Sequence, residues 1–319
     1  MKTWLVSGGV GFIGHHVVRA LVARGDRVRV LDDFSDAPYP RRLKERNATE
    51  LTKGSNGAVE VVEGCVTDPS IVARVTTGAS GVLHLAGLAG VRPSFADPAR
   101  YMRVNVEGTA VMLDAAQRAG IELFALASSS SVYGNTTPLP AREDEPAIDP
   151  ESPYAASKRG AELAAAAMLK KTPAMRCAAL RFFTVYGPRQ RPEMAISSFL
   201  RLVLADKPIT VFGDGSMRRD FTHVDDIVGG VLAAVEKTPP GFRAYNLGSG
   251  APVTLNALVE AMGVASGKNV KVQNAPIPLG DVDATFADIS RAKSELGWAP
   301  RMTLADGLRT VVDWLREEQ

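Results

Sequence analysis

Residues 4–14 read Trp-Leu-Val-Ser-Gly-Gly-Val-Gly-Phe-Ile-Gly, and this stretch decides the fold. Its apolar start predicts a short strand, and the glycines that follow have the spacing of a turn that opens a helix. Apolar residues at helical spacing continue to residue 22, and a second strand is predicted over 28–31. A strand, a helix and a strand in this order form a βαβ unit, which places the two strands parallel in one sheet.

The glycines stand where a dinucleotide-binding turn needs no side chain. Gly8 permits the tight turn, Gly11 lets a pyrophosphate approach the backbone, and Gly14 lets the helix pack closely on the strand. Asp32, at the end of the second strand, is placed to bind the adenosine ribose hydroxyls and to repel a 2′-phosphate, which favours NAD over NADP. The expected cofactor contacts are Gly8, Gly11, Phe12, Ile13, Gly14, Asp32 and, from the argument below, Lys158.

Further apolar runs continue the alternation of strands and helices. Strands are expected over 59–62, 82–85, 124–127 and 178–182, and helices near 97–119 and 153–171. This alternation predicts a Rossmann-type, doubly wound parallel sheet in the α/β class, with a smaller C-terminal α/β substrate lobe. The expected boundaries are 1–184 and 222–247 for the dinucleotide-binding domain, and 185–221 and 248–319 for the lobe.

Composition excludes several classes of protein. The chain has 319 residues, 45% of them hydrophobic, and a formal net charge of +2, which gives no reason to expect nucleic acid or an anionic membrane as a partner. Its two cysteines, Cys65 and Cys177, form neither a disulfide framework nor a zinc cluster, so no metal site is expected. No apolar run reaches the roughly 18 residues of a membrane span, and the start does not have the pattern of a signal peptide, so a cytoplasmic protein is predicted.

One charged segment and one histidine receive a structural interpretation. The segment 33–57 is polar and basic, with a short helix expected near 41–51, and charged runs of this kind are usually solvated. His15, directly after the glycine turn, is expected at the surface of the helix start. His84 and Asn105 are expected to have structural roles beside the cleft.

Tyr154 and Lys158 form a pair of the residue types that serve in acid–base catalysis. They are four residues apart in a predicted helix and therefore share one face. A free tyrosine has a pKa of about 10 and is a poor base at neutral pH, but a nearby ammonium and a positive nicotinamide ring lower that pKa. A Tyr–Lys pair alone is common on helix surfaces. Combined with the dinucleotide turn and the serine run 128–131, it predicts a catalytic site.

These motifs together resemble the extended short-chain dehydrogenase/reductase family, over nearly the whole chain. Later stretches that match in order are 132–134, 217–221, 223–226 and 288–298. The resemblance implies an NAD-dependent nucleotide-sugar epimerase, an isomerase in which hydride leaves C4 of the sugar, a 4-keto intermediate forms, and the hydride returns to the other face. It implies that Tyr154 takes the proton of the C4 hydroxyl, that Lys158 holds the nicotinamide ribose, and that Ser129 hydrogen-bonds the C4 oxygen.

Residues around the serine run distinguish the branches of the family. Family dehydratases carry an Asp-Glu pair where this chain has Ser130 and Ser131, and the decarboxylases carry Glu at the second of these places and Asn at the place of Thr184. The stretches 183–188 and 191–195 are similar to UDP-glucuronate 4-epimerases, which implies conversion of UDP-glucuronate to UDP-galacturonate. A UDP-glucose/UDP-galactose 4-epimerase, a UDP-glucuronate decarboxylase and a dinucleotide sensor without turnover remain alternatives.

The uronate substrate makes a specific demand on the site. Its 4-keto form is a β-keto acid that tends to lose CO₂, so an epimerase must hold the carboxylate with the scissile bond out of line with the carbonyl π system. Thr184, Ser130 and Arg191 are the candidates, since a guanidinium offers a carboxylate two parallel donors. The resemblance also implies a homodimer and further substrate contacts: Arg92, Arg219 at the phosphates, Thr210 and Phe212 beside the uracil, and Asp281 at the uridine ribose.

Overall fold

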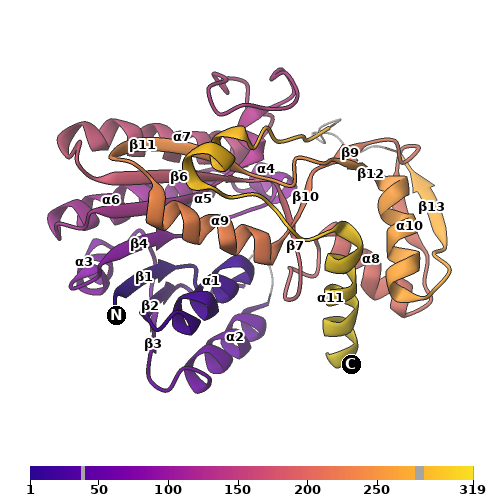
Figure 1. Ribbon diagram of the computed structural model, residues 1–319, viewed down its shortest axis with the longest axis horizontal. Coiled ribbons are helices and arrows are strands. Elements are labelled where there is room, and N and C mark those ends of the chain that lie inside the picture. Colours follow the sequence, from indigo (N-terminus) through magenta and orange to yellow (C-terminus); the bar gives the residue numbers. More distant parts are fainter. Residues whose placement is uncertain (37–39, 277–283, 319) are drawn as a thin grey trace.

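The computed structural model describes residues 1–36, 40–276 and 284–318 (Figure 1). Its main sheet consists of β1 (Thr3–Ser7), β2 (Arg27–Asp32), β3 (Val59–Glu63), β4 (Gly81–His84), β5 (Leu123–Ser129), β6 (Arg176–Phe182) and β11 (Gly241–Leu247). The seven strands are parallel, in the order β11-β6-β5-β4-β1-β2-β3. The strand order reverses between β1 and β4, and this reversal is the point at which open parallel sheets bind their ligands. The predicted Rossmann-type sheet is confirmed, and β11 is a strand that the sequence pattern did not reveal.

Alternation of side chains along each strand gives the sheet two apolar faces. Trp4 and Val6 of β1 belong to the core on one face, whereas Leu5 belongs to the core on the other. The first face is covered by α1 (Phe12–Ala23), α2 (Arg41–Lys53) and α9 (Val224–Lys237), and the second by α3 (Pro69–Thr76), α6 (Gly108–Arg118) and α7 (Pro153–Met168). Both faces are therefore buried, as a doubly wound sheet requires.

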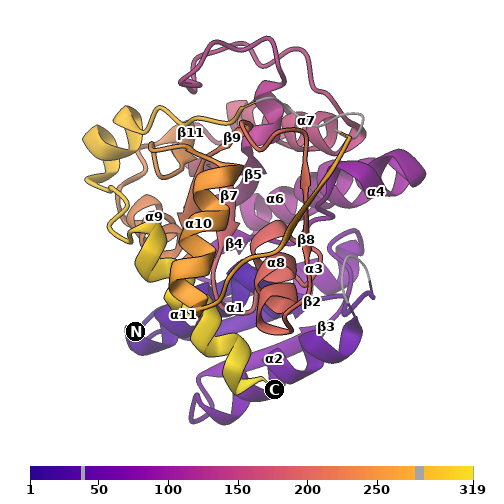
Figure 2. The same ribbon diagram turned by 90° about the vertical axis from the view of Figure 1, so that its right-hand side faces the viewer.

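The C-terminal part of the chain adds a smaller layer with its own core. Helices α8 (Ala195–Leu204), α10 (Leu255–Ser266) and α11 (Leu304–Glu317) share an apolar cluster that includes Leu200 and Leu258, and they lie in front of the sheet in Figure 2. Paired short strands accompany them: β7 (Thr184–Tyr186) with β10 (Phe221–His223), β8 (Ile209–Phe212) with β13 (Val272–Ala275), and β9 (Arg218–Arg219) with β12 (Val253–Thr254). This layer brings residues of the C-terminal half to the carboxyl edge of the sheet.

The helix expected near 97–119 consists of three consecutive segments, α5 (Pro98–Met102), η1 (Arg103–Glu107) and α6. The remaining elements are α4 (Val91–Ala96), η2 (Ser130–Tyr133), η3 (Leu169–Lys171) and η4 (Ala292–Leu296). In η1, Asn105 accepts a hydrogen bond from Leu88 N at 2.8 Å and donates to Leu88 O at 3.0 Å, so it ties this helix to the strand end beside the cleft. The structural roles expected for Asn105 and for His84, whose Nδ1 lies 2.7 Å from Ser7 Oγ, are confirmed.

Two expectations of solvent exposure were wrong. Helix α2 forms where a helix was predicted and leaves Arg42 exposed, but Lys44 and Asn47 on its inner face are only 7% and 3% exposed. His15 is 1% exposed rather than at the surface. The reason is tertiary: α2 packs against α1, and Arg189, from a distant part of the chain, reaches Asn47.

None of the helices within the described ranges is long and apolar enough to cross a membrane. The same residues contain no group of His, Cys, Asp and Glu side chains arranged to hold a metal ion.

Candidate active site

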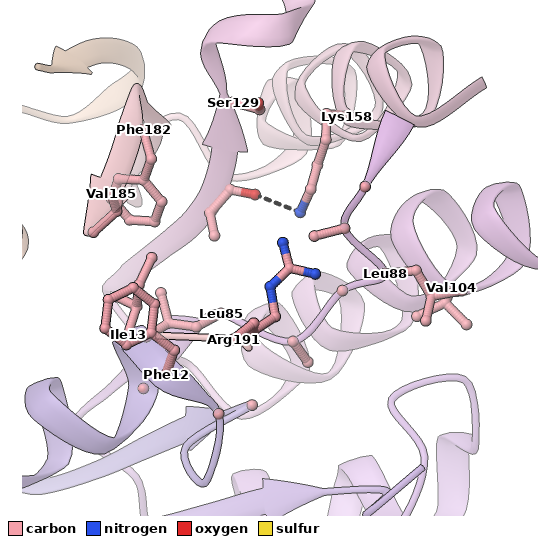
Figure 3. Close-up of a pocket in the computed structure, with 18 of the residues that line it drawn as sticks. Phe12, Ile13, Leu85, Leu88, Val104, Ser129, Lys158, Phe182, Val185 and Arg191 are labelled. Carbon is pink, nitrogen blue, oxygen red and sulfur yellow. Dashed lines mark hydrogen bonds between the residues drawn. The ribbon is translucent and has the colours of Figure 1, made fainter. Parts of the chain in front are cut away.

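A cavity of about 530 Å³ opens at the carboxyl edge of the sheet, across the point where the strand order reverses. Residues that follow β1, β2, β4 and β5 form much of its wall, and the segment 182–194 forms another part. Figure 3 shows Phe12 and Ile13, at the start of α1, on one side of the cavity and Arg191 reaching into it. The volume is typical of a small-molecule site, and the place is the one that a doubly wound sheet offers to ligands.

The glycine turn forms one end of this cavity as a cradle without side chains. Gly8 has φ +71°, and a Cβ on it would lie 2.6 Å from Ala86 N, while a Cβ on Gly14 would lie 2.1 Å from Gly8 O. Gly11 caps α1 without a side-chain hydrogen bond to the helix, so N–H groups of the first turn stay available to an anion. The turn therefore fits the pyrophosphate of a dinucleotide.

Asp32 lies at the end of β2, where the sequence predicted a ribose-binding carboxylate. Its Oδ1 accepts a hydrogen bond from Phe34 N at 3.1 Å and lies 3.6 Å from Lys44 Nζ. Burial raises the pKa of Asp32, and the Lys44 ammonium opposes that rise. Lys44 was missed in the sequence because its basic segment looked solvated, yet it lines the cavity beside Asp32. A carboxylate with an adjacent ammonium suits the hydroxyl groups of an adenosine ribose.

Lys158 projects from α7 into the middle of the cavity. Its Nζ donates a hydrogen bond of 2.9 Å to Ala127 O, drawn as a dashed line in Figure 3. A Cβ on Gly87 would lie 2.9 Å from this Nζ, so the missing side chain makes room for the ammonium. Burial lowers the pKa of Lys158 to about 8, against the opposing charge of Glu162.

This burial predicts a pH-dependent stability of the cofactor-free protein. Between about pH 8 and 10.5 the native lysine is neutral while the unfolded one still binds its proton, so the free energy of unfolding rises with pH. From pH 7 to 9.5 we expect a rise of about 2 kcal/mol relative to Lys158→Met, because that variant lacks the titrating group. Urea unfolding of both proteins across this range measures the difference. A constant difference would show that the lysine is not destabilised by burial.

Tyr154 and Ser129 lie beside Lys158 in the cavity wall. Ser152 caps the start of α7, because its hydroxyl accepts a hydrogen bond from Ala155 N at 3.2 Å, and this start sets which side chains of the helix face the cavity. Burial raises the pKa of Tyr154, whereas the Ser129 hydroxyl and the Arg191 guanidinium lower it. The structure thus brings Ser129, at the end of β5, together with Tyr154 and Lys158 of α7.

The residues expected to hold a carboxylate lie in the same cavity. Ser130, Thr184 and Arg191 all line it. The Arg191 guanidinium is 3.0 Å from Glu193 Oε1 and donates to Met194 Sδ at 3.4 Å, and Figure 3 shows it projecting toward Lys158. An exposed carboxylate partner and a weak sulfur acceptor leave such a guanidinium able to bind an incoming anion.

Four other predicted substrate contacts are not among the described residues that line the cavity, namely Arg92, Thr210, Phe212 and Arg219. The Arg92 guanidinium lies 5.5 Å from the centre of the Phe212 ring, and Thr210 stands on the same strand two residues earlier, where it accepts a hydrogen bond from Gln273. Arg219 is on β9 and donates to Arg218 O at 3.0 Å. Asp281 lies outside the described residues. The roles of these residues stay predictions.

Sequence reasoning also passed over Gln190. This side chain is 2% exposed, lines the cavity, donates to Val185 O at 2.8 Å and accepts from Ser197 N at 3.1 Å. It therefore fixes the start of α8 and the segment that carries Arg191. In the sequence, the one feature that singles out Gln190 is its position between Arg189 and Arg191.

Together the fold and the cavity define a Rossmann-type dinucleotide-binding protein with a Tyr–Lys pair and an arginine in the cofactor cavity. The family described as "NAD dependent epimerase/dehydratase family" matches residues 4–248. The chain belongs to this family, which confirms the resemblance drawn from its motifs.

Similar relatives include UDP-glucuronate 4-epimerases and a structure with UDP-glucuronic acid bound. A UDP-glucuronate 4-epimerase from Thermodesulfobacterium geofontis (strain OPF15) is 37% identical, over 99% of this chain and 97% of its own length. The structure of UDP-glucuronic acid 4-epimerase from Bacillus cereus with UDP-glucuronic acid and NAD has a TM-score of 0.90 and 32% identity, over 99% of this chain and 100% of that chain. MoeE5, solved with UDP-glucuronic acid and NAD, has a TM-score of 0.87 and 35% identity, with the same coverage.

Proposed function

We propose that this protein is an NAD-dependent isomerase that converts UDP-glucuronate to UDP-galacturonate by epimerisation at C4. The observation that carries the proposal is the presence of Arg191, Thr184 and Ser130 in the cavity that also contains Tyr154 and Lys158. A guanidinium and two hydroxyls that line one cavity suit a carboxylate better than a neutral hydroxymethyl group. The names and bound ligands of the relatives support the same assignment.

When bound, NAD would supply the hydride acceptor for C4 of the sugar and the hydride donor for its opposite face. The residues that would hold it are Gly8, Gly11, Phe12, Ile13, Gly14, Asp32 and Lys158. The glycine turn fits its pyrophosphate because a Cβ at Gly8 or Gly14 would collide with backbone atoms. Asp32 binds the ribose hydroxyls and disfavours a 2′-phosphate in this arrangement.

Tyr154 is the proposed acid and base at the C4 hydroxyl. It removes the hydroxyl proton as the hydride leaves and returns it when the hydride comes back. The Lys158 ammonium stabilises the phenolate and holds the nicotinamide ribose. Ser129 donates a hydrogen bond to the C4 oxygen, where negative charge develops.

Ser130 and Ser131 separate this reaction from the other reactions of the family. Both line the cavity, and neither offers the carboxyl group that elimination of water would need as its acid or base. Arg191, Thr184 and Ser130 hold the substrate carboxylate so that its C–C bond stays in the plane of the new carbonyl group. Decarboxylation is slow in that orientation because the breaking bond does not overlap the π system.

The remaining predictions form the wider proposal. Arg92 contacts the substrate, Thr210, Phe212 and Arg219 bind its UDP part, residues 1–184 and 222–247 form the dinucleotide domain, and residues 185–221 and 248–319 form the sugar-nucleotide lobe. The separate core of α8, α10 and α11 supports this division. A homodimer is supported by exposed apolar side chains on neighbouring helices, namely Phe95, Met102 and Leu163. The paucity of cysteines supports a cytoplasmic location.

The direct experiment follows the sugar by proton NMR. The purified protein is incubated with UDP-glucuronate and NAD, and UDP-galacturonate is expected to appear until a fixed ratio is reached, without net NADH. Conversion of UDP-glucose to UDP-galactose, with UDP-glucuronate untouched, would overturn the carboxylate assignment. Release of CO₂ with a UDP-pentose as the main product would establish a decarboxylase instead.

Arg191→Met tests the carboxylate assignment at one side chain. We expect kcat/KM for UDP-glucuronate to fall about 100-fold, the effect of losing a hydrogen-bonded ion pair inside a cavity, and activity on UDP-glucose to change little. Steady-state kinetics on both substrates measure this. Arg74→Met, an exposed site on α3, is the matched control and leaves both activities unchanged. An equal loss on both sugars would contradict the assignment.

A further inference from the structure

The segment that leads to Arg191 rests directly on the helices of the dinucleotide cradle. Pro188 O accepts a hydrogen bond of 2.9 Å from His16 Nε2 on α1. The next residue, Arg189, donates from Nη1 to Asn47 Oδ1 on α2 at 2.7 Å, and its Nη2 pairs with Glu50. These contacts join parts of the chain that are 139 to 172 residues apart. The segment is therefore fastened to the cofactor side of the cavity shortly before it delivers Arg191 into the interior.

Asn47 continues this connection into the glycine turn. Its Nδ2 donates a hydrogen bond of 2.9 Å to Val10 O, and the side chain is 3% exposed. Val10 lies between Gly9 and Gly11, inside the turn that forms the phosphate cradle. The orientation of the amide follows from chemistry, because a carbonyl oxygen only accepts and a guanidinium only donates. A continuous path thus runs from Val10 O through Asn47 to Arg189.

The surroundings of this path are buried. His15, whose pKa burial lowers to about 3 and which Arg189 disfavours further as a cation, is 1% exposed. Within the described residues, neither of its ring nitrogens has a hydrogen-bond partner. A neutral imidazole adds no repulsion to the arginine, and exclusion of water strengthens the hydrogen bonds next to it.

Arg189 holds a backbone conformation that its own side chain does not favour. Its φ is +67°, in the left-handed region that non-glycine residues rarely adopt. A residue stays in this region when the surrounding contacts determine it. The bonds to Asn47 and Glu50 supply such contacts, so the side chain and the backbone turn of this segment depend on each other.

We propose that Arg189 and Asn47 are positioning residues that couple the glycine turn to the segment carrying Arg191, so that bound NAD and a correctly placed Arg191 stabilise each other. A dinucleotide that fixes the glycine turn also fixes Val10 O, and with it the amide that receives the arginine. By reciprocity, a ligand that engages Arg191 tightens the cradle. Only the part that concerns Arg191 rests on the proposed function.

Two variants cut the path at different points. Arg189→Gly removes the guanidinium and places at φ +67° the residue that best tolerates it, so backbone strain cannot explain a loss. Asn47→Asp keeps an acceptor for Arg189 but sets a carboxylate oxygen against Val10 O, which removes the link to the turn alone. Arg42→Ala, on the exposed face of the same helix, is the control.

The first readout is the affinity for NAD, measured by calorimetry without any sugar. We expect Arg189→Gly and Asn47→Asp each to raise the NAD dissociation constant about tenfold, within the usual range of coupling between sites, and Arg42→Ala to leave it unchanged. Wild-type NAD affinity in either variant overturns the proposal. Thermal unfolding of the cofactor-free proteins is measured alongside, and Asn47→Asp, which keeps an ion pair with Arg189, retains the fold.

The second readout uses the binding of UDP and of UDP-glucuronate with saturating NAD, in a Tyr154→Phe background that strongly slows turnover. Arg189→Gly is expected to weaken UDP-glucuronate about tenfold and to leave UDP unchanged, because only the former reaches Arg191. Equal weakening of both ligands overturns the positioning role. Failure of the proposed function has a different signature, namely an equal loss of activity on UDP-glucuronate and UDP-glucose in Arg191→Met. The NAD measurement involves no sugar, so its result does not depend on the proposed function.

Discussion

Tyr154→Phe is expected to lower kcat for UDP-glucuronate about 10³-fold, within the range for removal of a positioned acid–base group. The phenol is the group placed beside Ser129 and Lys158 to accept the C4 proton, and phenylalanine fills the same space without it. Binding should survive, because the ring and the cavity stay intact. We therefore expect dissociation constants for NAD and UDP-glucuronate within about twofold of the wild-type values, a difference of at most about 0.4 kcal/mol in binding free energy.

Tyr101→Phe is the matched control for this variant. The Tyr101 ring centre lies 6.3 Å from that of Tyr154 at an interplanar angle of 80°, and its hydroxyl donates to Ala89 O at 3.0 Å. Loss of this phenol removes a structural hydrogen bond and should change kcat by less than about tenfold. Steady-state rates measured by NMR for both variants test whether the loss is specific to Tyr154. Comparable losses would show that Tyr154 is not the acid–base group.

Arg181→Met is expected to lower the free energy of unfolding by about 3–5 kcal/mol, because it leaves a buried carboxylate without its main partner. Arg181 Nε and Nη2 donate to the Glu162 carboxylate at 2.9 and 2.8 Å, and the two side chains are 2% and 0% exposed. Ser128 Oγ also donates to Glu162 at 2.6 Å, so the pair lies directly behind the strand that carries Ser129. The charge left on Glu162 has poor access to water, and the Arg159 guanidinium that donates to its Oε2 at 2.9 Å is 23% exposed and compensates it less than Arg181 does.

A double variant separates the pair from general packing. Arg181→Met with Glu162→Leu removes both charges and should recover most of the stability, since apolar replacements of buried ion pairs are often neutral. Arg118→Met breaks the surface pair with Asp114, whose side chains are 80% and 44% exposed, and should change stability by less than about 1 kcal/mol. Urea unfolding of the cofactor-free proteins gives all three values. A small effect of Arg181→Met alone would refute the argument.

The sequence predicted those parts of the molecule that depend on local spacing. The βαβ unit, the glycine turn and the Tyr154–Lys158 pair each require residues a fixed number of positions apart, and this spacing survives folding unchanged. The carboxyl edge of a parallel sheet then explains why Asp32 and Ser129 share one cavity. The candidate site was therefore predictable wherever a residue follows directly on a strand or lies on one helical face.

The remainder depends on contacts between distant parts of the chain. Lys44 and Asn47 look like solvated residues in a basic helix until a segment some 140 residues later covers them, as the 142-residue separation of Arg189 and Asn47 shows. His15 is buried for the same reason. Within the described ranges β11 pairs with β6 alone, and its register from Gly241 opposite Arg176 is set by tertiary packing rather than by a local signal.

The buried ammonium of Lys158, which donates to Ala127 O, determines how this protein responds to selection for thermal stability. A library screened only for survival of heating rewards replacement of this lysine by an apolar residue, because a folded chain without the cofactor gains from losing a buried charge. Such a screen enriches well-folded, inert molecules. Thermostable descendants of this chain have to be selected for turnover in the same round, or with the cofactor present.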